Sequence, residues 1–186
     1  MGLILASRSP RRQELLRLFD LPFDVREADI DETPLADESA AAMTERLAQQ
    51  KARAIATDLP DHWVLGGDTT VAIDGNLLGK PADRAEAIHM LEQLSGNQHD
   101  VISAVALVGP DFVGTDISVT RVTFMDLTPG MIAQYCDTGE PYDKAGGYGI
   151  QGPAGTFVTE IRGSYSGVVG LPLYETRMLL HRAGLI

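Results

Sequence analysis

Apolar residues recur along the chain with two periods, and these periods predict the order of its secondary structure elements. Spacings of three and four residues, as at Leu15, Leu16 and Phe19, are typical of amphipathic helices. Short apolar runs and apolar–polar alternation are typical of strands. Strands are predicted at 1–6, 21–25, 64–73, 100–108, 115–124 and 156–161, and helices at 10–19, 39–57, 83–95, 128–136 and after Pro172.

The stretch 64–81 places a carboxylate where an apolar strand is predicted. Asp68 follows two glycines that leave room for a close approach, and β-branched residues resume after it. An Asp-Gly pair at 74–75 is a strong signal for a hairpin, which brings Lys80 back towards the strand. A buried carboxylate costs free energy unless a cation or hydrogen bonds compensate it. The pattern fits a phosphate or metal site and, equally well, a structural Asp68–Lys80 ion pair.

A basic turn joins the first predicted strand to the first helix. Ser9 is a suitable N-cap and Pro10 fits the first helical position. Arg8, Arg11 and Arg12 then lie near the positive end of the helix dipole, where cations are unfavourable. A phosphate at this turn would meet free backbone amides and guanidinium groups together. The alternative is a solvated basic turn.

Three further segments carry polar groups whose role the local pattern leaves open. The acidic run 29–32, which includes Glu32, is taken by itself as a solvated loop. Lys51 lies on the apolar face of the helix 39–57, where it either reaches back to solvent, the commoner outcome, or points into a cleft. The segment 139–153 contains five glycines, which forbid a regular helix and let the backbone approach a ligand. This loop would present Asp143, Lys144 and Gln151.

Composition narrows the class of protein. The 186 residues are 44% apolar and 22% charged, as in a globular protein with one sizeable core. The net charge of −11 argues against nucleic acid and anionic membranes as partners. Cys136 is the single cysteine, so no intrachain disulfide forms, and we expect it to be a buried apolar residue in a cytoplasmic protein. We expect no signal peptide, no transmembrane segment, and one domain over residues 1–186.

The residue inventory favours phosphoryl transfer to water. The four histidines are scattered, which excludes zinc chemistry, and the sequence has no nucleophile elbow, Walker A loop or dinucleotide fingerprint. What remains is a set of acids, lysines and arginines. Such a set suits a hard divalent cation held between carboxylates and phosphate oxygens.

Six segments spread along the whole chain form a recognisable set. In order, they are Ser7-x-Ser9-Pro10-Arg11-Arg12-x-Glu14-Leu15-Leu16, Gly67-Asp68-Thr69, Gly79-Lys80-Pro81, Leu94-Ser95-Gly96, Asp143-Lys144-Ala145-Gly146-x-Tyr148-Gly149-Ile150-Gln151-Gly152 and Gly163-Ser164-Tyr165 through Gly170-Leu171-Pro172. This set resembles the motifs of the Maf family. The resemblance implies an α/β fold akin to the inosine triphosphatases, with a mixed twisted sheet flanked by helices and two lobes around a central cleft. It implies a nucleoside triphosphate pyrophosphatase that forms a homodimer.

The resemblance also assigns roles to single residues. Asp68 is expected to be the general base and, with Glu32, to hold Mg²⁺ or Mn²⁺. Thr69 and Gln151 place the chain with the branch that acts on dTTP and UTP, not 7-methyl-GTP. Arg8, Gly67 and Gly147 depart from residues common in the family and leave this set intact. The expected substrate-binding residues are Ser7, Arg11, Arg12, Glu32, Lys51, Thr69, Lys80 and Gln151, of which Arg12, Thr69 and Gln151 set specificity.

Two other classes remain open from the sequence. One is a nucleotide-binding regulator of cell division in which hydrolysis is incidental, a role linked to the Maf name. The other is a nucleotidyltransferase, which also begins with a strand, a basic loop and a later Lys-Pro. That class needs a glycine-rich first loop, which residues 7–10 do not provide.

Overall fold

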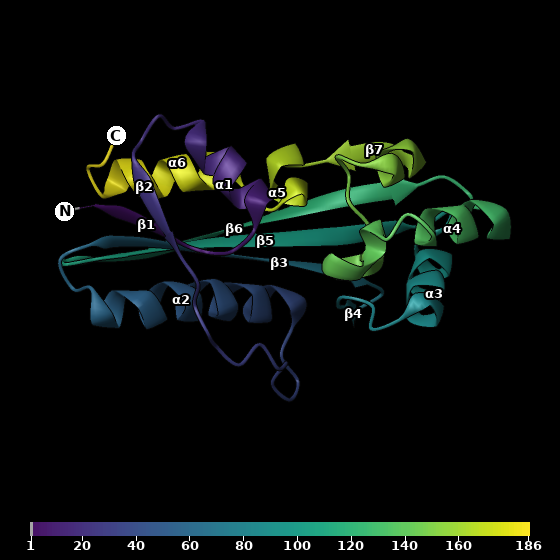
Figure 1. Cartoon of the computed structure of the whole chain (residues 1–186), viewed down its shortest axis with the longest axis horizontal. Coiled ribbons are helices and arrows are strands. Elements are labelled where there is room, and N and C mark those ends of the chain that lie inside the picture. Colours follow the sequence, from purple (N-terminus) through teal and green to yellow (C-terminus); the bar gives the residue numbers. More distant parts are fainter. Residues whose placement is uncertain (1) are drawn as a thin grey trace.

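The computed structural model describes residues 2–186 and contains a mixed sheet flanked by helices (Figure 1). The sheet order is β2-β1-β3-β5-β6-β7, and β4 pairs with β3. β1 runs parallel to β2 and β3, whereas the other pairs are antiparallel. The strands are β1 (Leu3–Ala6), β2 (Phe23–Arg26), β3 (Trp63–Ile73), β4 (Asn76–Leu78), β5 (Gln98–Gly109), β6 (Phe112–Phe124) and β7 (Val158–Arg162).

The helices lie where the periodicity predicts them. Ser9, Ser39, Asp83 and Thr128 each cap a helix through a side-chain oxygen, as their sequence positions indicate. The α-helices are α1 (Pro10–Arg17), α2 (Ala40–Asp58), α3 (Arg84–Leu94), α4 (Pro129–Cys136), α5 (Tyr165–Val169) and α6 (Leu173–Arg182), and the 3₁₀ helices are η1 (Glu140–Asp143), η2 (Ala145–Gly147) and η3 (Pro153–Phe157). No helix within residues 2–186 is both long and apolar enough for a membrane span.

The predicted element boundaries differ from the observed ones mainly at the ends of strands. The first strand starts at Leu3, and Met1 lies outside the described residues. The hairpin at 74–75 is confirmed, since Asp74 and Gly75 both have positive φ, as a two-residue hairpin turn requires. The short helix α5 begins at Tyr165, directly after Ser164, whose side chain caps it.

Two lobes share the long strands β3, β5 and β6 (Figure 1). In one lobe, α2 covers one face of the sheet, and α1 and α6 cover the other. Each face of the sheet has its own apolar core against the helices that cover it. On the α2 face, small residues such as Ala48 and Ala104 let the helix pack close to the sheet. A Cβ on Gly66 would lie 2.8 Å from the backbone nitrogen of Ala52, so the close approach predicted at this glycine is made by α2.

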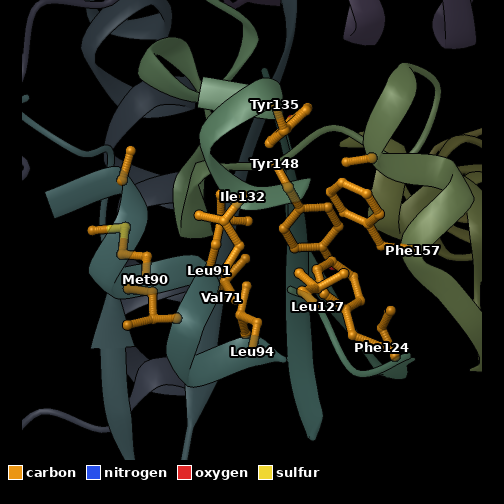
Figure 2. Close-up of a cluster of buried hydrophobic side chains, with 14 of the residues drawn as sticks. Val71, Met90, Leu91, Leu94, Phe124, Leu127, Ile132, Tyr135, Tyr148 and Phe157 are labelled. Carbon is orange, nitrogen blue, oxygen red and sulfur yellow. The ribbon is translucent and has the colours of Figure 1, made fainter. Parts of the chain in front are cut away.

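The second lobe surrounds the far end of the same strands. Its core packs Val71 of β3 against α3, α4 and an aromatic cluster (Figure 2). The rings of Phe124 and Tyr148 meet edge to face with centroids 4.8 Å apart. Cys136 is buried in this core, as predicted. The sheet, the two lobes and the flanking helices confirm the predicted fold class.

Candidate active site

A cavity of about 700 Å³ lies between the two lobes. It opens beside the middle of β3, where that strand lacks a neighbour on one edge. β1 pairs with β3 as far as Gly66, and β4 pairs with it only from Val71. Asp68 and Thr69 lie in this gap. The predicted site residues that line the cavity are Ser7, Arg11, Arg12, Glu32, Lys51, Thr69, Lys80 and Gln151.

Successive residues in the gap point to opposite faces of the sheet, as in any strand. The Asp68 side chain contacts Lys51 on α2. The Thr69 hydroxyl contacts Arg12 on α1 and Ser103 on β5. A ligand at this edge can therefore meet a carboxylate from one face and a hydroxyl from the other.

Lys51 joins the two expected metal-binding carboxylates. Its Nζ lies 2.7 Å from Asp68 Oδ1 and 2.7 Å from Glu32 Oε1. The side chains of Lys51 and Asp68 are only 11% and 10% exposed, whereas that of Glu32 is 54% exposed. Of the two placements that the sequence left open for Lys51, the structure shows the one in the cleft, where two carboxylates compensate its charge. The Asp68–Lys80 ion pair is wrong, since Asp68 pairs with Lys51 and Lys80 is exposed at the cavity wall.

The charges around Glu32 favour its ionised form. Partial burial raises the pKa of Glu32, but the hydrogen bond and charge of Lys51 outweigh it. The charges of Lys80 and Arg12 act in the same direction, so the pKa of Glu32 lies below its ordinary value. The acid that the local pattern placed in a solvated loop is thus drawn into the cavity wall.

The donor set fits a divalent cation that also binds phosphate. Glu32 Oε1 and Asp68 Oδ1 both bind the Lys51 ammonium, so the second oxygen of each carboxylate is the one that would bind a cation or its water. Across residues 2–186, no three or more His, Cys, Asp or Glu side chains gather as a complete metal cage. Mg²⁺ is commonly held by one or two carboxylates together with substrate phosphates, so two carboxylates are enough.

The basic turn forms the opposite wall of the cavity. Arg12 donates from Nε to the Gly170 carbonyl at 2.8 Å, and from its terminal nitrogens to Ser7 Oγ at 3.4 Å and Thr69 Oγ1 at 3.2 Å. Burial lowers the pKa of the Arg12 guanidinium, and the charge of Asp68 only partly offsets this. Three of the five N–H groups of Arg12 are used, leaving two for a ligand. The arginine is thus fixed in orientation.

Arg11 reaches across the cleft to the second lobe. Its guanidinium lies 3.7 Å from Asp143, which also accepts a hydrogen bond from Lys144 at 2.6 Å. Partial burial raises the pKa of Asp143, but Lys144 and Arg11 outweigh it and bring the pKa below its ordinary value. Arg8, in contrast, is exposed and pairs with Glu27 at the rim.

The glycine-rich segment forms the wall contributed by the second lobe. Gly146 docks against Val71, and its amide donates to the Gly79 carbonyl at 3.0 Å. Tyr148 is anchored by a 2.7 Å hydrogen bond with the buried His99. The loop then turns outward, so that Gln151 is exposed at the cavity wall.

Sequence reasoning missed several residues that hold this site in shape. Ser103 donates to the Gly167 carbonyl at 2.6 Å and lies 2.9 Å from Thr69 Oγ1. Its signal was a lone serine within the apolar run 100–108. Glu140 and Tyr148 also line the cavity. The hydrogen-bond partner of Tyr148 is His99, 49 residues earlier in the chain, so no local pattern marks the position of this ring.

Solved structures share this fold at low sequence identity. A chain described as nucleoside-triphosphatase / dITP/XTP pyrophosphatase from Mycobacterium abscessus aligns with a TM-score of 0.51 and 20% identity, covering 100% of this chain and 99% of that chain. The Ham1 protein of Staphylococcus aureus also aligns with a TM-score of 0.51, at 16% identity over 68% of this chain and 73% of that chain. These likenesses support the predicted inosine-triphosphatase-like fold.

Sequence relatives are much closer. A Myxococcus xanthus (strain DK1622) protein named dTTP/UTP pyrophosphatase is 54% identical over 183 residues, covering 98% of this chain and 93% of the relative. A Yersinia pestis bv. Antiqua protein of the same name is 51% identical over 180 residues, covering 96% and 91%. The model of the Maf family, described as Maf-like protein, matches residues 2–183. The chain therefore belongs to the Maf family.

Proposed function

We propose that this chain is a nucleoside triphosphate pyrophosphatase that hydrolyses dTTP and UTP to the monophosphate and pyrophosphate. One observation carries the proposal: Asp68 lies in the gap on β3, shielded from bulk water, with its Oδ1 held by Lys51. Arg11, Arg12 and Lys80 line the neighbouring cavity, and the charge of Asp68 acts on the Arg12 guanidinium. The names of the relatives at about half identity support the same activity.

In the proposed reaction, Asp68 acts as the general base. A water oxygen attacks the α-phosphorus while its proton passes to the Asp68 carboxylate. The bond between the α-phosphorus and the bridging oxygen to the β-phosphorus breaks, and pyrophosphate leaves. Lys51 holds Asp68 in place, because its ammonium fixes one carboxylate oxygen and leaves the other for the water.

Glu32 and Asp68 are the residues that would hold Mg²⁺ or Mn²⁺. When bound, such an ion neutralises charge on the phosphate oxygens. Arg11, Arg12 and Lys80 would bind the triphosphate, and the Ser7 hydroxyl adds a short polar group beside Arg12. The fixed orientation of Arg12 means that little entropy is lost when a phosphate binds there.

Base selection is assigned to Gln151 with Thr69. Uracil and thymine present an N3–H donor beside carbonyl acceptors, and a carboxamide offers the complementary acceptor and donor in one plane. A site built on hydrogen bonds rejects other bases because its own polar groups are then left unpaired. The proposal also takes residues 1–186 as one domain of a cytoplasmic homodimer.

The test is a panel of nucleoside triphosphates incubated with the protein and Mg²⁺ or Mn²⁺, with monophosphate and pyrophosphate measured separately. We expect dTTP and UTP to give the highest kcat/KM and to yield both products in equal amounts. Release of single phosphates, or a purine triphosphate ranking first, would contradict the proposal. Nucleotide binding without steady turnover would favour the cell-division regulator instead.

Asp68→Asn provides the matching residue test. The substitution keeps the shape of the side chain and removes the base, so turnover should fall about 10²- to 10⁴-fold while nucleotide binding remains. Asp111→Asn, in the exposed turn between β5 and β6, is the control and should leave turnover unchanged. Near-normal turnover in a folded Asp68→Asn protein would remove Asp68 from this role.

A further inference from the structure

The loop that carries Glu32 joins β2 to α2 and has little apolar packing near that residue. Ala28 packs against an apolar core at the start of the loop, but every residue from 31 to 37 is exposed, including Leu35 at 58%. Polar contacts therefore supply most of what holds Glu32 in place. The ion pair with Lys51 is one of them, but Glu32 is half exposed, and water screens such a pair so that it contributes little. A further contact is needed to hold the Glu32 carboxylate in its position beside Lys51 and Asp68.

Arg46 on α2 provides that contact. Its guanidinium binds both oxygens of Glu38, with Nε 2.6 Å from Oε1 and a terminal nitrogen 2.7 Å from Oε2. The same terminal nitrogen donates to the carbonyl of Thr33, the residue that follows Glu32, at 3.2 Å. Glu38 in turn accepts a hydrogen bond from the Leu35 amide at 3.1 Å. The arginine thus ties both ends of the segment 33–38 to the helix.

This ion pair differs from those elsewhere on the surface. The side chains of Arg46 and Glu38 are 19% and 8% exposed, compared with 49% and 66% for Arg84 and Asp137, a pair of similar length. The hydrogen bond from Arg46 lowers the pKa of Glu38 below its ordinary value. A bidentate, shielded pair of this kind keeps its geometry far better than an exposed one.

One helix therefore sets the relative position of both carboxylates. Lys51 of α2 binds Asp68, and Arg46 of the same helix binds the loop next to Glu32. The Gly66 contact fixes α2 against β3. Weaker contacts between Arg46 and the loop would let Glu32 change position, whereas Asp68 would stay in place because Lys51 binds it.

We propose that Arg46 is a positioning residue that holds Glu32 in the geometry needed for the metal and triphosphate. This inference rests on the proposed function, and it adds a pair, Arg46 with Glu38, that contacts neither substrate nor metal. Lysine should not replace Arg46, because its ammonium is a single point charge and lacks the planar fork by which two guanidinium nitrogens reach both Glu38 oxygens and the Thr33 carbonyl.

The test compares Arg46→Lys and Glu38→Gln with Glu32→Gln as the reference. Binding of Mn²⁺ in the presence of dTTP is followed by electron paramagnetic resonance, and turnover is measured across Mn²⁺ concentrations. Arg46→Lys and Glu38→Gln should each weaken Mn²⁺ binding about tenfold, the lower end for residues that support metal ligands. The ratio of kcat/KM for dTTP to that for GTP should stay unchanged, because Gln151 is untouched.

Amide hydrogen exchange gives a readout independent of activity. Exchange in residues 31–38 should become faster in Arg46→Lys, while α2 and β3 stay protected. Arg84→Lys, in the exposed pair with Asp137, is the matched control and should change neither Mn²⁺ binding nor exchange in the loop. If Arg46→Lys does not fold, Glu38→Gln tests the same pair, because it removes the negative charge and one of the two oxygens that accept from Arg46.

The outcomes separate the two proposals. Unchanged Mn²⁺ binding in the Arg46 and Glu38 variants, with weakened binding in Glu32→Gln, would overturn the positioning role alone. Unchanged Mn²⁺ binding in Glu32→Gln would also overturn the positioning role. Glu32 would then not bind the metal, and Arg46 would have no metal ligand to position. Failure of the wild-type protein to hydrolyse dTTP would count against the proposed function, whatever the loop variants show.

Discussion

Lys51→Met removes the ammonium group that compensates Asp68 and Glu32. Methionine keeps the length and flexibility of the side chain, so the change isolates charge. Removing one partner of a buried ion pair costs about 3–5 kcal/mol, because the other charge stays buried without compensation. The Glu32 contact adds little, since that side chain is 54% exposed and water screens it. The Asp68 contact therefore dominates the loss.

Because Arg12 is also positively charged, we expect the loss in the free energy of unfolding to lie at the low end of the range of about 3–5 kcal/mol. Asp68 acts on the guanidinium of Arg12 across the cavity, so part of the compensation remains after Lys51 is lost. We expect Lys51→Met to lower the free energy of unfolding by about 3 kcal/mol, a large part of the 5–15 kcal/mol typical of such domains. Lys51→Met combined with Asp68→Asn should recover most of that loss, because no unpaired buried charge remains.

The assay is urea unfolding followed by the fluorescence of Trp63, the single tryptophan, with circular dichroism as a second probe. Lys80→Met is the control: this exposed lysine of the same cavity should shift stability by about 0.5 kcal/mol or less. A Lys51→Met protein as stable as the Lys80→Met control would refute the argument. So would a double variant no more stable than Lys51→Met.

Three further predictions concern base choice, phosphate binding and pH. Gln151→Ala should reduce the preference for UTP over GTP by about 1–3 kcal/mol, measured as a ratio of kcat/KM; an unchanged ratio would place base recognition elsewhere. Arg12→Lys should lose about 2–4 kcal/mol in kcat/KM because an ammonium cannot reproduce the contacts to Gly170, Ser7 and a phosphate; wild-type kinetics would contradict this. Burial lowers the pKa of His99 from 6.5 to about 4, so the unfolded chain takes up the proton first as the pH falls. Stability should therefore drop between pH 6.5 and about pH 4, by up to about 3 kcal/mol, and His99→Gln should flatten that slope in urea titrations across this range.

Local sequence signals predict the elements well but fail for contacts between them. The caps at Ser9 and Ser39 and the turn at 74–75 depend on neighbouring residues, so their chemistry is readable from the chain itself. The partner of Asp68 is not local. Proximity in sequence favours Lys80, but the packing of α2 on β3 delivers Lys51 instead.

The same limit applies within the cavity. Arg12 is recognisable as an anion-binding candidate because three arginines crowd one helix start. Its bond to Gly170 depends on how the C-terminal segment folds back, and its bond to Thr69 depends on the pairing of β1 with β3. Local spacing reveals neither. Arg46 and Glu38 lie on a helix and a loop whose pattern is that of ordinary surface residues, so their pairing emerges only from the structure.

The gap on the edge of β3 has a consequence for self-association. An unpaired strand edge offers free N–H and C=O groups, which invite another chain to add a strand and aggregate. Here the open edge spans only residues 67–70, because β1 ends beside Gly66 and β4 begins beside Val71. A typical added strand of about five or six residues would collide with one of these neighbours. At this gap, backbone can thus be exposed to a small ligand while an added strand is excluded.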